Sequence, residues 1–293
     1  MATIARVSSL APAEQSPATP IAWPLRAWLA VEVLFGVLAI SSIALSPQQT
    51  ATNFAWPIKP DVMAATLGAF YLASALLFVP VLFARTWQDI RATTLPAVGF
   101  TLAMLVTTFL HWEKFSVGTA PFYVWFASYL LPPPIFAALY WWHQRRSAPV
   151  GLGLTRPVAG WLRAGLVANG ALLLGLAVLF YAAPTLLQRI APWQFTPLTV
   201  RTLCGWLIGI GLLQLALARE GDWARMRLGT IQLIALPPML ALQLARFHGQ
   251  VRWGTPALWV FLIDCVLVAA PLLALWLTMR TGQRGRSDAA RGD

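Results

Sequence analysis

The chain has 293 residues, of which 58% are hydrophobic and only 11% are charged, and its formal net charge is +11. Soluble domains usually carry about 25% charged residues, so this composition excludes a fold that water covers on all sides. The positive charge does not indicate a nucleic-acid partner, because most basic residues flank apolar segments and form no stripe along one of them. The composition is typical of a protein that lies in a lipid bilayer.

Apolar segments of about 20 residues follow one another along the chain, and this length crosses a hydrocarbon core of about 30 Å. They cover residues 27–46, 62–84, 92–111, 120–142, 162–183, 198–218, 228–245 and 256–279. The connections are too short to hold a soluble domain. The sequence therefore predicts an all-α, polytopic integral membrane protein with about eight transmembrane helices. Residues 1–20 and 282–293 hold no apolar run, so we expect disordered cytoplasmic tails there and no signal peptide.

Basic residues predict the orientation, since Lys and Arg are enriched at the cytoplasmic ends of transmembrane helices. With a cytoplasmic N-terminus, 15 of the 21 basic residues fall on the inner side and six on the outer side. Twelve of the 15 tryptophans fall at span ends, where the amphipathic indole ring prefers the headgroup region. We expect a multi-pass protein of the bacterial plasma (inner) membrane with both termini in the cytoplasm.

The sequence also matches itself at an offset of 137 positions, or 136 within the first inner loop. The matched pairs are Trp56 with Trp193, Pro60 with Pro197, His111 with His248, Trp87 with Trp223 and Arg91 with Arg227. These residue types are rare in an apolar chain, so chance does not explain their alignment. We predict two parallel four-helix repeats, residues 20–146 and 156–281, related by a pseudo-two-fold axis along the membrane normal. The alternative is a duplication that only builds a stable bundle, without transport.

Small residues at four-residue spacing let helices approach closely in lipid. The second span has Ala64 and Gly68, and the sixth has Gly205 and Gly209. We expect these two spans at the centre of the bundle, packed against each other.

Prolines fall inside two other spans: Pro132, Pro133 and Pro134 in the fourth, and Pro237 and Pro238 in the seventh. Each removes a backbone donor and frees the carbonyl four residues earlier. We expect both helices to break, with the freed carbonyls turned toward protein or water. A kinked span packed against its neighbours is the alternative.

Polar side chains inside spans are the candidate binding residues, because they are costly in lipid. Glu32 in the first span and Asp264 in the eighth are carboxyls, and low dielectric favours their uncharged form. At the repeat offset Glu32 falls on Asn169, and Asp264 falls near Tyr129. We expect Glu32 to face the seam between the halves near Asn169, and Arg201 to lie at a depth that allows an ion pair with Asp264. Either acid can carry protons or tie helices together by hydrogen bonds.

The matched inner loops form a second candidate site, since each combines an acid, a tryptophan and arginines. The repeated motif consists of Trp87 and Arg91 in the first loop and Trp223 and Arg227 in the second. It predicts an interfacial anchor whose arginines face anionic lipid headgroups, or a repeated gate or docking surface that faces the cytoplasm.

Catalytic, cofactor and metal motifs are missing from the sequence. His111 and His248 have no Cys or Met partner that would make them a haem or copper site, so we expect no metal and no cofactor. No phosphate loop, metalloprotease motif or nucleophile elbow occurs. We assign no catalytic residue, and an enzyme is the least favoured class.

The run Phe54-Ala-Trp-Pro-Ile-Lys-Pro60 and the later run Thr196-Pro-Leu-Thr-Val-Arg201 resemble a family of uncharacterised bacterial multi-pass membrane proteins with no known activity. The resemblance covers most of the chain and implies a membrane fold, but it transfers no functional residue. The duplication, the buried acids and the prolines favour a proton-linked transporter or channel-like protein with its path between the halves. The alternative is a non-catalytic assembly factor or structural subunit of a larger membrane complex, or a homo-oligomer.

Overall fold

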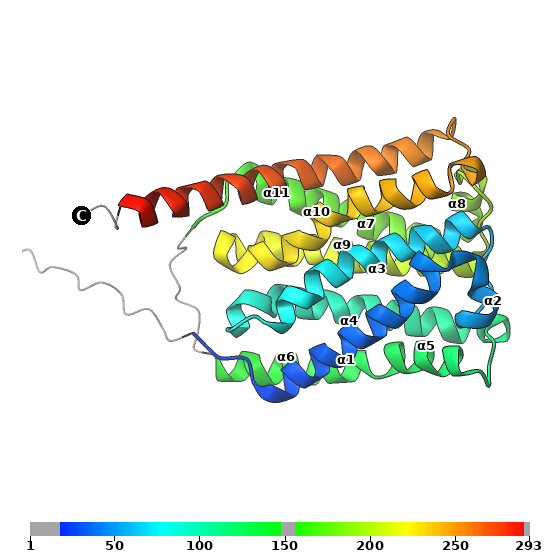
Figure 1. The fold of residues 1–293 in the computed structure, drawn as a ribbon, viewed down its shortest axis with the longest axis horizontal. Coiled ribbons are helices and arrows are strands. Elements are labelled where there is room, and N and C mark those ends of the chain that lie inside the picture. The colour runs from blue at the N-terminus through cyan, green and yellow to red at the C-terminus, as the bar shows by residue number, and fades with distance from the viewer. Residues whose placement is uncertain (1–17, 148–155, 290–293) are drawn as a thin grey trace, which may run out of the picture.

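The computed structural model describes residues 18–147 and 156–289, which form a bundle of long helices (Figure 1). Eight helical spans in this part of the chain are long and apolar enough to cross a membrane. They are α1 with the π-helical segment η1 (Trp23–Ala39 and Ile40–Leu45), α3 (Asp61–Leu82), α4 (Trp87–Leu110), α5 with α6 (Ala120–Leu130 and Pro132–Arg146), α7 (Gly160–Ala182), α9 (Pro197–Glu220), α10 (Trp223–Arg246) and α11 (Pro256–Ala289). The predicted polytopic all-α fold is therefore confirmed.

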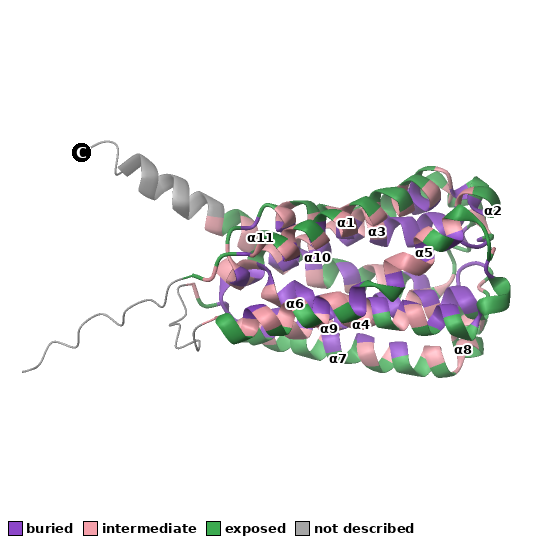
Figure 2. Ribbon diagram, turned by 90° about the horizontal axis from the view of Figure 1, so that it is seen from below, coloured by how far each residue is buried: buried purple, intermediate pink, exposed green. Residues whose placement is uncertain are grey.

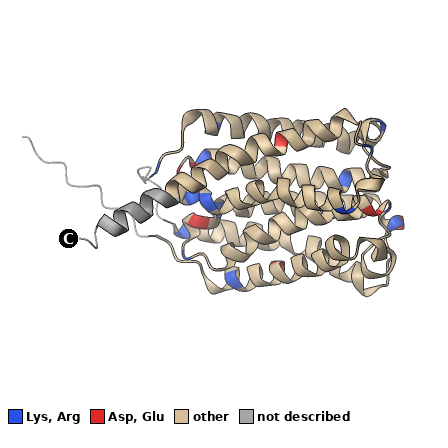
Figure 3. Cartoon of the chain, turned by 45° about the horizontal axis from the view of Figure 1, so that its top comes forward, with Lys and Arg blue, Asp and Glu red and all other residues tan. Residues whose placement is uncertain are grey.

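The short elements all lie in the connections at one end of the bundle. They are η2 (Pro47–Gln49), α2 (Thr50–Asn53), η3 (Trp112–Lys114), α8 (Pro184–Ile190) and η4 (His248–Gln250). We call this end the distal face. The other end, which we call the terminal face, carries the start of α1, the start of α7 and the C-terminal part of α11 (Figure 1). Charged residues gather at the two faces, and few occur along the bundle between them (Figure 3).

The prediction of a disordered C-terminal tail from residue 282 is wrong for residues 282–289. No proline stops α11 at Gly282, and the helix continues to Ala289. The remaining parts of the two predicted tails, residues 1–17 and 290–293, lie outside the described residues.

The helices α3 and α9 are the most buried spans, as predicted (Figure 2). Their small residues face other partners than expected, however. A Cβ atom on Gly68 would come within 2.6 Å of the Cα atom of Ala44 in η1, and one on Gly211 would come within 2.9 Å of the carbonyl oxygen of Gly170 in α7. The expected contact between the glycine faces of α3 and α9 is therefore wrong. The segment η1 lies against the small face of α3, and side chains of α4 lie against Gly205 and Gly209 of α9.

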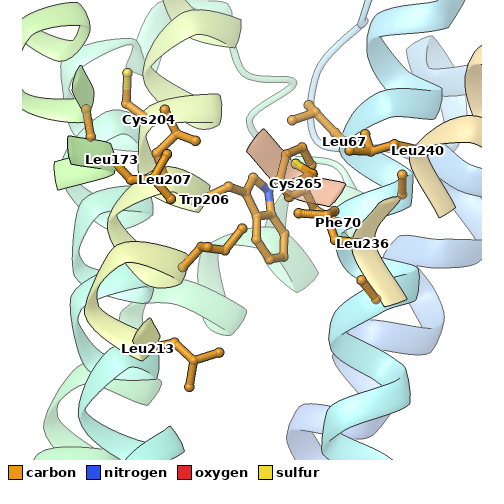
Figure 4. Close-up of a cluster of buried hydrophobic side chains, with 14 of the residues drawn as sticks. Leu67, Phe70, Leu173, Cys204, Trp206, Leu207, Leu213, Leu236, Leu240 and Cys265 are labelled. Atoms are coloured by element: carbon orange, nitrogen blue, oxygen red, sulfur yellow. The ribbon is translucent and has the colours of Figure 1, made fainter. Parts of the chain in front are cut away.

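Large aromatic side chains join α3 and α9 instead. Trp206 points from α9 toward Phe70 on α3, and the two rings stack with centroids 5.4 Å apart (Figure 4). The main packing partner of α3 in the second half is α10, and that of α9 in the first half is α4. The two halves of the chain thus interlock, with each half contributing a helix to the core of the other.

Several contacts recur at the offset found in the sequence. The backbone N–H of Trp87 donates to the carbonyl of Thr19 at 2.8 Å, and that of Trp223 donates to the carbonyl of Arg156 at 2.8 Å. In the same way, Arg26 donates to the carbonyl of Leu82 and Arg163 to that of Ala218, each at 3.0 Å. Both arginines thereby satisfy carbonyls at the end of a helix that have no partner within it. These matched contacts agree with the predicted repeat, but the arrangement as two four-helix units stays a prediction.

The two groups of prolines behave differently. The span with Pro132 breaks as expected, because α5 ends at Leu130 and α6 begins at Pro132. In α10, Pro237 and Pro238 lie inside one continuous helix, so the expected break there is wrong. Contacts with α3, α4, α9 and α11 surround α10 and hold its course. The α5–α6 junction lies at the edge of the bundle, where the side chain of Leu131 is exposed.

Candidate functional site: a cavity around Glu32

A cavity of about 410 Å³ lies in the first half of the chain, among α1, α3, α4 and α5, with side chains of α9 and α10 along its back. Most of its lining is apolar or aromatic. The polar lining residues are Glu32, Ser41, Ser42, Asn53, Tyr71, Ser74, Thr93, Thr101, Ser128, Tyr129 and Gln232. A mostly apolar cavity of this size with a few polar groups is the usual form of a small-molecule site.

Glu32 lies near the middle of its span. It is nine residues after Trp23, which corresponds to roughly 13 Å at the rise of an α-helix. Its side chain is partly buried, and its Oε1 atom is buried without a hydrogen-bond partner in the described part of the chain. A buried carboxylate oxygen without a partner is costly, so this atom needs a proton, a water molecule or a ligand.

Two tyrosines from different helices meet at the same depth. The hydroxyl groups of Tyr71 on α3 and Tyr129 on α5 form a hydrogen bond with each other, and both residues line the cavity with Glu32. Tyr129 occupies the last turn of α5 before the proline break, so the break sets its position. The ring of Tyr129 packs on Trp125 at 4.3 Å, and that of Tyr71 packs on Trp206 at 4.9 Å.

Half of the six unpartnered buried polar side-chain atoms in the described residues belong to residues that line the cavity. Within the described residues, three lining residues hold a buried polar side-chain atom without a partner: Glu32, Asn53 and Trp206. By contrast, Gln232 of α10 donates from Nε2 to the hydroxyl of Ser74 at 2.9 Å and is satisfied. Since buried polar groups are almost always hydrogen-bonded, unpartnered groups from three elements around one cavity indicate that it takes a polar occupant.

The cavity opens sideways. Val37 and Leu38 on α1 and Val79 on α3 line it, and their side chains are 50%, 41% and 45% exposed. In a membrane this exposed surface faces lipid. This side of the cavity therefore faces the bilayer and not the interior of the helix bundle.

The second half holds a smaller version of this arrangement. Asn169 on α7 donates to Asp264 on α11 at 3.4 Å, beside a void of about 20 Å³. The expected approach of Glu32 to Asn169 is therefore wrong, because Asn169 bonds to Asp264, whereas Glu32 lines the larger cavity in the first half. The carboxyl of Asp264 has a partner where that of Glu32 has none, and no comparable space lies next to it.

Arg201 does not bind Asp264 either. It lies four residues after the start of α9 at the distal face, whereas Asp264 lies eight residues into α11, roughly 6 Å deeper. Its NH1 atom lies 2.7 Å from Nε2 of His111, and its Nε atom donates to the carbonyl of Tyr181. Burial and the nearby Arg201 charge lower the pKa of His111. The imidazole is thus held neutral, with Nε2 accepting from the guanidinium.

The matched terminal-face loops carry ion pairs between the halves. Arg91 of α4 binds Glu220 of α9 through two hydrogen bonds of 2.6 Å and 2.5 Å, and Arg227 lies 3.8 Å from Asp89. The expectation that Arg91 faces lipid headgroups is wrong, because its side chain is only 14% exposed. The two loops hold the halves together at this face.

The tryptophans of these loops are not interfacial anchors. Trp87 is fully buried and stacks on His143 with ring centroids 4.9 Å apart. Trp223 is also buried and meets Trp276 edge to face at 5.6 Å. Both rings serve as packing between helices.

Sequence reasoning selected Glu32 and Tyr129 but missed their surroundings. Tyr71 and Gln232 are polar residues in the middle of apolar spans, a signal that could have selected them. Trp206 and Trp125 carried no such signal, because aromatic residues are common in apolar helices.

Together, fold and cavity define a polytopic α-helical membrane protein with a laterally open pocket that contains one carboxyl group. Comparisons with protein-family models, with curated proteins and with solved structures give no match.

Proposed function

We propose that the chain is a proton-linked transporter or channel-like protein of the bacterial plasma membrane, with the Glu32 cavity as its substrate site. The observation that carries the proposal is the unpartnered Glu32 oxygen at mid-span in a cavity of about 410 Å³. Low dielectric disfavours the charged form of a carboxyl group, so the occupant of the cavity affects whether Glu32 holds its proton. Occupation of the cavity and protonation of Glu32 are therefore coupled.

The path runs through the first half of the chain and not along the seam that the duplication suggested. Trp206 and Phe70 fill the seam, and the Arg91–Glu220 pair joins the halves at the terminal face. The cavity extends from Asn53 in the distal connection to Thr93, which lies six residues into α4 from the terminal face. It thus spans much of the depth of the bundle. The two parallel repeats supply the interlocked frame that holds it.

The second candidate is a non-catalytic assembly factor, a structural subunit of a larger membrane complex, or a homo-oligomer. The packed seam and the short connections favour it. The difference between Glu32 and Asn169 at matched positions favours it as well, since a symmetric transport path would need similar groups in both halves.

Proteoliposomes distinguish these two functions. The protein is reconstituted with a pH-sensitive dye inside the vesicles, a proton gradient is imposed, and lipophilic compounds of positive, neutral and negative charge are added in turn. We expect at least one compound to collapse the gradient faster with wild-type protein than in protein-free vesicles, and Glu32→Gln to abolish the difference. Asp264→Asn is the matched control and should retain it. If no compound moves protons above the protein-free rate, the transport proposal is wrong.

A further inference from the structure

The only charge that the cavity lining can carry within the described residues is negative. Glu32 is the only charged side chain among the described residues that line it, and no Lys, Arg or His faces it. An ionised carboxylate away from water is costly unless a positive group neutralises it. Anionic ligands such as phosphate or fatty-acid headgroups would add a second negative charge without a counter-charge. The site therefore accepts a proton or a cation, and both compete for the same carboxyl group.

Aromatic residues line the same cavity as this carboxyl. Tyr129 packs on Trp125 at 4.3 Å, Tyr71 on Trp206 at 4.9 Å, and Trp206 on Phe100 at 4.2 Å, and all five residues line the cavity. The faces of aromatic rings attract organic cations, and the attraction is stronger where water is excluded. Small hydrated cations such as Na⁺ need several oxygen ligands around one point. Most hydroxyl groups of the lining instead donate to carbonyls of their own helices, namely those of Ser41, Ser42, Thr93, Thr101 and Ser128.

We propose that the cavity binds a lipophilic organic cation in exchange for the proton of Glu32. The apolar lining takes the body of the ligand, the rings and the carboxylate take its charge, and the exposed edge at Val37, Leu38 and Val79 admits it from the bilayer. This inference rests on the proposed function and names its substrate class.

The exchange balances in charge. When the cation enters, the Glu32 carboxylic acid releases one proton to solution and becomes a carboxylate. When the cation leaves, one proton returns. The other titratable groups that face Glu32 are Tyr71 from α3 and Tyr129 from α5, while α4, α9 and α10 present the uncharged side chains of Thr101, Trp206 and Gln232. Protons and cation compete for one group, so affinity for the cation should fall as the pH is lowered.

The test is the binding of radiolabelled tetraphenylphosphonium to purified protein in lipid nanodiscs, with empty nanodiscs subtracted. Tetraphenylborate has nearly the same shape and the opposite charge, so it separates charge recognition from partitioning into an apolar space. We expect wild-type protein to bind tetraphenylphosphonium with release of one proton and to reject tetraphenylborate. Glu32→Gln should weaken binding at least about tenfold, the usual effect of losing an interaction with a charged group, and should remove its pH dependence. Asp264→Asn is the control and should bind like wild type.

Equal binding of both probes, or unchanged tetraphenylphosphonium binding by Glu32→Gln, would overturn the inference. Glu32→Asp keeps the charge and should retain part of the affinity, which would assign the loss in Glu32→Gln to the missing charge. The melting temperature of Glu32→Gln should stay close to that of wild type, so that the loss is not one of folding. Failure of the inference and failure of the proposed function give different results. If the protein binds the cation but carries no protons, the cation site is supported and the transporter proposal is wrong. If only a neutral compound drives proton flux, the transporter proposal is supported and the cation site is wrong.

Discussion

Arg91 of α4 holds the carboxylate of Glu220 of α9 through two parallel hydrogen bonds, and this pair joins the two halves of the chain at the terminal face. Two-bond contacts between arginine and carboxylate are geometrically specific and stronger than single hydrogen bonds between neutral groups. The side chains are only 14% and 9% exposed, so water screens them weakly. Removing one partner leaves the other charge without compensation.

Arg91→Ala and Glu220→Ala should each destabilise the protein by about 3 kcal/mol, the range found when one member of a mostly buried pair is removed. Unfolding of purified protein in detergent measures the effect. The double variant should lose less stability than the two single variants lose in sum, because no charge is then left without its partner. Lys59→Ala is the control. Lys59 pairs with Asp61, but its side chain is 64% exposed, so its loss should change stability by less than about 1 kcal/mol.

The close approach of α3 and η1 gives a second prediction. A Cβ atom on Gly68 would lie 2.6 Å from backbone of Ala44, which a small side-chain movement does not relieve. Gly68→Ala should therefore lower stability by about 2 kcal/mol or more. Gly165→Ala on α7 is the control, since a Cβ atom there meets nothing within 4 Å. It should be neutral or stabilising by up to about 1 kcal/mol, the gain in helix propensity. Similar losses in both variants would contradict the packing described for α3.

His111 gives a prediction about pH. Burial and Arg201 lower its pKa in the folded protein, while in the unfolded chain the pKa is about 6.5. Below that pH the unfolded chain binds a proton that the folded protein binds less readily, so protons favour unfolding. The stabilising contribution is complete above pH 6.5 and is lost as the pH falls toward the lowered value.

The melting temperature measured at pH 7.5 and pH 5.5 tests this linkage. His111→Asn should reduce the difference between the two pH values. His248→Asn changes the exposed residue at the matched position and should leave the wild-type difference in place. If both variants behave alike, His111 does not cause the pH dependence.

Much of the fold was readable from the sequence because the bilayer imposes simple rules. Eight apolar segments and the break at Pro132 follow from length and from proline chemistry alone. The partners of the polar residues did not follow. Glu32 and Asn169 align at the repeat offset, yet Asn169 bonds to Asp264 while Glu32 lines a separate cavity. Trp87 resembles an interfacial anchor but is buried against His143. Side-chain direction around a helix decides such contacts, and an apolar helix surrounded by lipid and protein shows little periodic pattern from which to predict it.

The last prediction concerns the reactivity of Glu32. Dicyclohexylcarbodiimide is an apolar reagent that adds to a carboxyl group in its protonated form and leaves a stable acylurea on the side chain. Glu32 combines a mid-span position, a laterally open cavity and an oxygen without a partner, so the reagent should modify it from the bilayer. Glu220 is the internal control, because Arg91 occupies both of its carboxyl oxygens and the side chain is only 9% exposed. Peptide mass spectrometry after labelling in membranes should find the adduct on the peptide that contains Glu32, and Glu32→Gln should remove it. Prior addition of tetraphenylphosphonium should slow the labelling, since the cation displaces the proton on which the reaction depends. An adduct on Glu220 with none on Glu32 would mean that the cavity is closed to lipid or that its carboxyl carries no proton.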